Sequence, residues 1–207
     1  VFFGTGFVVG DGTLVVTNAH VVDREAHFDE NERLMVFVHR EGRDRGIPVQ
    51  VLRRDERHDL AVLRLHGGRL PALALAGPGR RVREGDEVLF TGYPIGTVLG
   101  LYPVTHRGMV SAIVPIAIPA GRSRELTPER IHGLRHPFPV YQLDATAYPG
   151  NSGSPVYDPH SGRVLGIINM VFVKKRRENA LREPSGISYA IPVAHLRRLL
   201  AGLAGAP

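Results

Sequence analysis

The stretch Y-P-G-N-S-G-S-P at residues 148–155 places Ser152 between two glycines, among residues that favour tight turns. Gly, Asn, Ser and Pro gather in turns for conformational reasons alone, so the stretch by itself does not separate a turn serine from a nucleophile. A serine hydroxyl becomes an effective nucleophile when a neighbouring base takes its proton. The rest of the chain therefore has to supply a base, a group that orients the base, and donors for an oxyanion.

Short apolar runs broken by turn clusters make up most of the chain around this stretch. They cover residues 2–9, 13–17, 34–38, 48–52 and 60–65 in the first half, and 87–92, 108–114, 141–145, 163–170 and 187–192 in the second. Strands at this spacing, with an Asp-Gly turn and no alternation with helices, predict an all-β sandwich or barrel. Helix is expected at 19–23, as a single turn, and at 192–203, where apolar residues follow a helical period.

Composition excludes several classes of protein. The 207 residues, 43% of them hydrophobic, suit a soluble globular protein with a real core, and no apolar run reaches the roughly 20 residues of a membrane helix. The chain has no cysteine, so it has neither disulfides nor thiolate metal sites. No cofactor is expected. His132 and His136 have the i, i+4 spacing of a zinc pair, but H-G-L-R-H lacks the glutamate of H-E-x-x-H, so no metal site is expected there.

The formal net charge of +6 comes almost entirely from arginine. Nucleic-acid binding calls for a basic face with interleaved aromatic residues, whereas these arginines are scattered and aromatic residues make up only 7% of the chain. Nucleic acid is therefore not the expected partner. The run K-K-R-R at 174–177 is either a solvated surface segment or a cluster that attracts acidic substrate segments.

Three weak signals combine into a stronger one. His20 follows an apolar strand in T-N-A-H-V-V, and Asp59 opens a buried strand in H-D-L-A-V-L. Together with Ser152 they give the chain order His, Asp, Ser, which is that of chymotrypsin-like proteases and differs from those of subtilisins and α/β-hydrolases. Asp55 and Glu56, which precede the strand, are expected to be solvated. His58 should point to the opposite side of an extended chain from Asp59.

Eight motifs extend the likeness along the chain. In order they are G-T-G-F-V-V (4–9), T-N-A-H-V-V (17–22), H-D-L-A-V-L (58–63), G-Y-P-I-G (92–96), G-M-V-S-A-I (108–113), P-G-N-S-G-S-P (149–155), L-G-I-I-N-M (165–170) and G-I-S-Y-A-I-P (186–192). This series resembles bacterial trypsin-like serine proteases and is most similar to the HtrA/DegP protease domain. The segment G-N-S-G-S-P is also similar to that of bacterial glutamyl endopeptidases.

The resemblance implies an all-β fold of two six-stranded antiparallel β-barrels with the active site between them. The N-terminal barrel, residues 1–95, would carry the histidine and aspartate. The C-terminal barrel, residues 96–191, would carry the serine, with 93–103 as the crossing between the halves. Residues 192–207 would form a C-terminal helix.

The resemblance also implies a role for each site residue. Ser152 would be the nucleophile, His20 the base and then the acid, and Asp59 the group that orients the imidazole. The N–H groups of Gly150 and Ser152 would bind the oxyanion. The substrate pocket would be lined by Thr146, Ala147, Ile168, Asn169, Met170, Val171, Gly186 and Ser188. No acidic residue stands among them, and Ile168 takes the position of the histidine of glutamyl endopeptidases, so cleavage is expected after small or medium apolar residues.

Two departures from the trypsin pattern bear on activation and on the loop. Asn151 stands where trypsin has the aspartate that pairs with a freed N-terminus, and Val1 does not begin I-V-G-G. Activation by N-terminal clipping is therefore not expected. Ser154 replaces the second glycine of G-N-S-G-G, at a place where glycine tolerates more conformations.

The function expected from the sequence is serine endopeptidase activity through an acyl-enzyme, compatible with a role in protein quality control. Two alternatives stay open: an inactive peptide-binding pseudoprotease on the same fold, and a basic module that binds polyanions. The expected partner is a protein or peptide substrate, without a membrane segment in this chain, and a homo-oligomer is compatible with the resemblance. The resemblance favours a bacterial periplasmic or other extracytoplasmic location.

Overall fold

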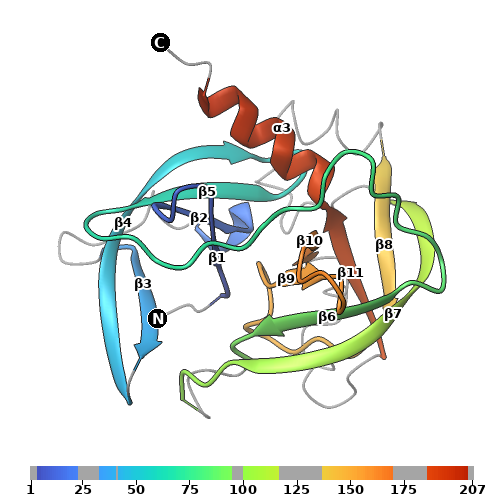
Figure 1. Cartoon of the computed structure of the whole chain (residues 1–207), viewed down its shortest axis with the longest axis horizontal. Helices are drawn as coiled ribbons and strands as arrows, with labels where there is room; N and C mark the ends of the chain where they lie inside the picture. The colour runs from blue at the N-terminus through green and yellow to red at the C-terminus, as the bar shows by residue number, and fades with distance from the viewer. Residues whose placement is uncertain are drawn as a thin grey trace, which may run out of the picture.

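The computed structural model describes residues 4–22, 33–40, 42–94, 100–116, 137–169 and 186–204, which form two β units and a C-terminal helix (Figure 1). In the first unit five strands are ordered β1-β2-β5-β4-β3, and every neighbouring pair is antiparallel. The strands are β1 (Phe7–Val9), β2 (Leu14–Thr17), β3 (Met35–Arg40), β4 (Arg43–Asp55) and β5 (Leu60–Leu65).

The second unit is a closed barrel with the strand order β10-β11-β8-β7-β6-β9. Its strands are β6 (Glu87–Gly92), β7 (Val104–Ile116), β8 (Phe138–Asp144), β9 (Pro155–Tyr157), β10 (Val164–Asn169) and β11 (Ile187–Pro192). The all-β architecture, the six-stranded C-terminal barrel and the C-terminal helix that the sequence predicted are confirmed. The N-terminal unit differs in detail, because its described residues form a curled five-stranded sheet in place of a closed six-stranded barrel.

The boundary predicted between residues 95 and 96 lies one strand too late. β6 precedes that boundary, yet it pairs with β7 on one side and with β9 on the other. These two pairings close the barrel, because without β6 the strands β7 and β9 would each leave an edge of unpaired backbone groups. The crossing between the two units is therefore the segment 66–86 and not the predicted 93–103.

The apolar run of β5 explains how the two units share a core. Successive side chains of a strand point to opposite faces of a sheet. Accordingly Ala61 and Leu63 pack in a cluster confined to the first unit, whereas Leu60 and Val62 pack in the large cluster that holds the interior of the barrel. The first sheet is thus buried on both faces at β5, and this burial fixes the first unit against the barrel.

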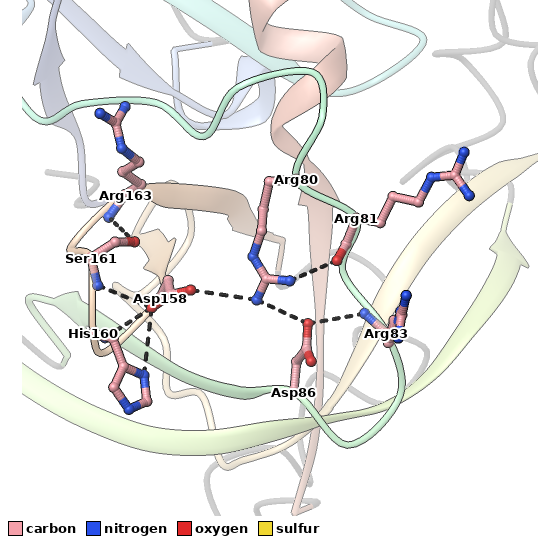
Figure 2. A network of polar contacts seen from close by, with 8 residues as sticks. All are labelled: Arg80, Arg81, Arg83, Asp86, Asp158, His160, Ser161 and Arg163. Atoms are coloured by element: carbon pink, nitrogen blue, oxygen red, sulfur yellow. Dashed lines mark hydrogen bonds and ion pairs between the residues drawn. The ribbon is translucent and has the colours of Figure 1, made fainter.

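The crossing segment is attached to the barrel by backbone and side-chain contacts. Ala76 N–H donates to Val164 O at 2.9 Å, and Val164 N–H donates to Ala74 O at 2.9 Å. Farther along, Arg80 reaches Asp86 at 3.1 Å and Asp158 at 3.4 Å, as Figure 2 shows. The polar network of Arg80 therefore ties the end of the crossing to the β9–β10 hairpin.

Helix α3 (Val193–Ala204) follows β11 directly and contacts β10, β11 and β4, so that it bridges the two units (Figure 1). Its buried face carries His195, Leu196 and Leu199. The short turn expected at 19–23 is the 3₁₀-helix η1 (Ala19–Val21). No helix in the described part of the chain has the length and apolar character needed to cross a membrane.

Candidate active site

His20 lies on η1, just after β2, and one carboxylate holds it at two atoms. Its ring Nδ1 is 2.5 Å from Asp59 Oδ2, and its backbone N–H donates to Asp59 Oδ1 at 2.8 Å. The other ring nitrogen, Nε2, is buried and has no hydrogen-bond partner among the described residues. The imidazole is therefore fixed in orientation by Asp59 while one nitrogen stays available.

Asp59 occupies the tight turn that joins β4 to β5, with a φ of 50°. Positive φ is uncommon outside glycine, and Asp and Asn are the residues that adopt it most readily among the others. The conformation is held in place because the side chain of Asn18 donates to Asp59 O at 2.9 Å. Asn169 Nδ2 donates a third hydrogen bond to the carboxylate, at Asp59 Oδ2, with a distance of 2.7 Å. The carboxylate is thus buried, fully engaged and aimed at His20.

The segment 148–154, here called the serine loop, begins with a turn closed by a bond from Asn151 N–H to Tyr148 O at 2.9 Å. Its second residue is Pro149, whose ring fixes φ near −65°, and its third is Gly150, with a φ of 101°. This combination is a type II turn, which requires positive φ at the third position. Gly150 is therefore needed for the turn itself.

A second turn follows at once and places Ser152 at its corner. Ser154 N–H donates to Asn151 O at 3.0 Å, and Gly153 has a φ of 89°. A Cβ atom on Gly153 would stand only 2.1 Å from Thr5 O, so no other residue fits there. Within the described part of the chain, the N–H groups of Gly150 and Ser152 have no hydrogen-bond partner. One of these two unpaired donors belongs to Ser152 itself, and the other lies two residues before it.

Contacts from both units bring the serine loop to the His20–Asp59 pair. On the barrel side, Asn169 donates to Asp59, and the preceding Ile168 accepts a bond from Gly153 N–H at 3.0 Å. On the side of the first sheet, a Cβ on Gly153 would lie 2.5 Å from the hydroxyl of Thr17, three residues before His20. The three residues that the sequence singled out therefore converge on one place between the two units.

The residues predicted to line a substrate pocket lie at the ends of three strands of the barrel. Thr146 and Ala147 follow β8, Ile168 and Asn169 end β10, and Gly186 and Ser188 stand at the start of β11. Met170, Val171 and the run 174–177 lie outside the described residues. Asn169 differs from its predicted place, because its side chain is fully buried and bonded to Asp59.

Asp55 and His58 form a second pair that the sequence did not predict. Asp55 was expected to be solvated, but it ends β4 and its Oδ2 lies 2.7 Å from His58 Nδ1. The ring of His58 packs tilted against that of His195 of α3, with ring centres 3.9 Å apart, and meets Phe138 at 4.7 Å. The prediction for His58 assumed an extended chain, whereas residues 56–59 form a turn. Asp55 keeps only 24% of its side chain exposed and is bonded to His58, so it is half-buried where the sequence predicted a solvated carboxylate.

Two neighbours of the site escaped the sequence reasoning, and a third was assigned another role. Asn18 supports the turn of Asp59 and Thr5 contacts the serine loop, whereas Asn169, predicted to line the pocket, supports the carboxylate of Asp59. All three fall inside quoted motifs, but nothing in a motif tells which neighbour a polar side chain will meet. Their roles depend on contacts across 41 to 145 residues of sequence.

The described residues hold no group of three or more His, Cys, Asp or Glu side chains that could hold a metal ion. His132 and His136, the zinc-like pair of the sequence, are outside the described residues.

A serine on a tight glycine loop, together with a histidine held by a buried aspartate in a chain of two β units, is the residue set of the chymotrypsin-fold class of serine hydrolases. The chain belongs to the trypsin-like peptidase domain family, whose model matches residues 4–167. It is similar to HtrA- and DegP-type serine proteases.

Individual relatives agree with this assignment. The chain is 32% identical to a mitochondrial serine protease HTRA2 of Drosophila persimilis over 95% of its own length and 38% of the relative's. It is 32% identical to a probable periplasmic serine endoprotease, DegP-like, of Hahella chejuensis over 92% of its length and 33% of that protein's. The chain thus spans about a third to two fifths of the length of these relatives.

Solved structures support the fold. The inactive form of the Rv3671c protease from M. tuberculosis matches with a TM-score of 0.65 at 23% identity, over 98% of this chain and 84% of that one. The active form matches with a TM-score of 0.66 at 23% identity, over 99% of this chain and 74% of that one.

Proposed function

We propose that this chain is the catalytic domain of a serine endopeptidase, with Ser152 as nucleophile, His20 as general base and then acid, and Asp59 as the group that orients His20. One observation carries the proposal: Asp59 holds His20 at both its backbone N–H and its ring Nδ1, while Nε2 is buried without a partner among the described residues. A histidine held in this way keeps its proton on Nδ1 and offers a lone pair at Nε2.

The chemistry follows from these positions. Nε2 of His20 takes the proton of the Ser152 hydroxyl as Oγ attacks the scissile carbonyl, and the carbonyl π electrons move to its oxygen. The N–H groups of Gly150 and Ser152, which are unpaired within the described residues, supply two donors for that oxyanion. When the tetrahedral intermediate collapses, the C–N bond breaks and the leaving amine takes the proton from His20. Water then hydrolyses the acyl-enzyme by the same route.

The test is covalent labelling with an organophosphonate, followed by mass mapping of the modified residue. We expect the label on Ser152 and a loss of about 10⁶-fold in kcat for Ser152→Ala. Ser161→Ala is the matched control, because Ser161 stands in an exposed hairpin turn. Peptide hydrolysis that survives in Ser152→Ala, or a label on another serine, refutes the assignment. A wild-type protein that binds peptides without cleaving them favours the pseudoprotease.

We further propose that cleavage follows small or medium apolar residues. None of the predicted lining residues is acidic, and this composition supports the proposal. An apolar pocket discriminates by about 1–3 kcal/mol per methylene, so the preference should be graded. A peptide library that varies the residue before the cut tests this. A preference for Glu, Arg or Lys there contradicts it.

A further inference from the structure

Thr5 lies on the segment before β1, in the contact between the first sheet and the serine loop. It is 3% exposed, and each of its three polar atoms is engaged. Its N–H donates to Ser152 O at 2.8 Å, and its hydroxyl donates to Gly150 O at 2.7 Å. The hydroxyl also accepts from Tyr93 N–H at 3.0 Å, and Thr5 O accepts from the Thr17 hydroxyl at 2.7 Å. One residue therefore joins the serine loop, the end of β6 and the end of β2.

The two carbonyls that Thr5 binds belong to the residues whose N–H groups are proposed to hold the oxyanion. A peptide unit is planar, so fixing its carbonyl also fixes the opposite N–H. The Gly150 carbonyl shares its peptide unit with Asn151 N–H, and the Ser152 carbonyl shares its unit with Gly153 N–H. The peptide that presents Ser152 N–H lies between these two held units. Thr5 thereby restricts the rotation that would turn this donor away.

The side chain inside the loop does not provide this restraint. Asn151 is fully buried, and neither its amide nitrogen nor its amide oxygen has a hydrogen-bond partner among the described residues. Packing instead confirms the close fit around Thr5: a Cβ on Gly92 would lie 3.0 Å from the Thr5 hydroxyl and 2.2 Å from that of Ser154. The bond from Thr5 to Gly150 O is partly buried, and a carbonyl shielded from water costs free energy when it loses its donor, so Gly150 O depends on Thr5.

We propose that Thr5 is a positioning residue for the reaction, which holds the oxyanion-binding face of the serine loop and couples it, through Thr17, to the end of β2, the strand that precedes His20. The inference rests on the proposed function, because the N–H groups matter to catalysis only if Ser152 is the nucleophile. Thr5 itself touches neither the substrate nor the reacting atoms.

The experiment compares Thr5→Val, which keeps the shape and the backbone bonds but loses the hydroxyl, with Thr5→Ser, which keeps the hydroxyl. Thr105→Val is the matched control, since Thr105 is exposed on β7 and its hydroxyl bonds to that of Thr91. Active-site titration normalises kcat to competent enzyme. Removing one oxyanion donor costs about 10²–10³-fold, and we expect an indirect loss of about 10- to 100-fold in kcat for Thr5→Val. We expect Thr5→Ser and Thr105→Val to stay within about threefold of the parent, with KM nearly unchanged throughout.

A peptide aldehyde separates positioning from simple loss of structure. Its tetrahedral adduct uses the oxyanion donors, so its inhibition constant should rise in parallel with the fall in kcat for Thr5→Val. If kcat per titrated site and aldehyde affinity are both unchanged in Thr5→Val, Thr5 has only a structural role and the proposal is wrong.

A measurement without turnover keeps this test independent of the proposed function. In the Ser152→Ala background, Thr5→Val should speed amide hydrogen exchange at Asn151 and Gly153. The N–H of Asn151 donates to Tyr148 O inside the loop, and that of Gly153 donates to Ile168 O of β10. Unchanged exchange at these two amides refutes the role of Thr5 whether or not the protein cleaves peptides. If exchange is faster in Thr5→Val while the parent protein with Ser152 intact shows no peptidase activity, the restraint is supported and the proposed function is refuted.

Discussion

Two histidine–aspartate pairs with the same local geometry stand next to each other in this protein. Asp59 binds the ring Nδ1 of His20 at 2.5 Å and its backbone N–H at 2.8 Å. Asp55 binds the ring Nδ1 of His58 at 2.7 Å and its backbone N–H at 3.1 Å. The pairs differ in what the far side of each ring meets. A held imidazole is therefore not by itself a catalytic group, and its surroundings decide its use.

The surroundings of the two rings contrast clearly. His20 keeps a buried Nε2 without a partner among the described residues. His58 is instead packed between units, against His195 at 3.9 Å and Phe138 at 4.7 Å. The first arrangement leaves a lone pair for proton transfer, whereas the second uses the ring to hold α3 against the end of β4.

Replacing each histidine by alanine should give the largest difference in activity between the two pairs. We expect His20→Ala to lower kcat by about 10⁶-fold, as the loss of a catalytic base does in comparable triads, with little change in thermal stability. His58→Ala should lower the melting temperature while kcat per titrated active site stays within about threefold of the parent. Steady-state kinetics and thermal unfolding of both variants provide the check. Equal losses of activity would abolish the distinction between the pairs.

Exchanging each aspartate for asparagine should give the next largest effect. Asp59→Asn should cost about 10⁴-fold in kcat, because an amide group at Nδ1 favours the wrong imidazole tautomer, and asparagine still tolerates the positive φ. Asp55→Asn should cost about 1–3 kcal/mol of unfolding free energy through its half-buried bond to His58, with near-normal turnover. Urea unfolding and titrated kinetics distinguish the two outcomes. A catalytic loss at Asp55 like that at Asp59 would contradict this expectation.

The second pair should also make stability depend on pH. Burial lowers the pKa of His195 to about 3, and the charges of His58, Arg198 and Arg57 lower it as well. Asp55 acts in the opposite direction and raises this pKa. Burial would raise the pKa of Asp55, but its hydrogen bond and charge interaction with His58 outweigh burial and lower it. Both groups therefore bind protons more readily in the unfolded chain than in the folded protein.

The sign and the window follow from these shifts. Below the ordinary histidine pKa of about 6.5, the unfolded chain takes up a proton that folded His195 refuses, so stability falls as pH drops toward 3. The slope for this one group approaches about 1.4 kcal/mol per pH unit, or about 2 kcal/mol between pH 6.5 and 5. The contribution of Asp55 is present above its unfolded pKa and is lost at still lower pH. Between pH 6.5 and 5, the unfolding free energy of His195→Phe, measured by urea unfolding, should fall by about 2 kcal/mol less than that of the parent protein. An identical pH profile in the variant would argue against this account.

The smallest effect is expected where the charges are exposed. Arg80, which bridges Asp86 and Asp158, keeps 39% of its side chain exposed, so Arg80→Met should cost less than about 1 kcal/mol, and less still in high salt. Arg81→Met is the control, because only the carbonyl of Arg81 takes part in the network. Urea unfolding at low and high salt measures both. A cost above about 2 kcal/mol would show that the crossing segment depends on this network more than its exposure indicates.

Several features could be predicted because they depend on short-range patterns. The turn-bounded apolar runs and the helical period after Pro192 are local signals, and the fold agrees with them. The two turns of the serine loop were also encoded locally, because Gly150 and Gly153 adopt the positive φ values that glycine permits.

Other features required the folded chain. The assignment of β6 to the barrel depends on its two neighbouring strands, and no property of E-V-L-F-T-G distinguishes one barrel from the other. Burial of Asp55 depends on α3 lying against the end of β4, and the engagement of Asn169 depends on Asp59, 110 residues away. Sequence thus determined which residues could form a site and the local shapes that they prefer. The tertiary structure decided which neighbours they meet, because hydrogen bonding and burial act between groups that are close in space and often distant along the chain.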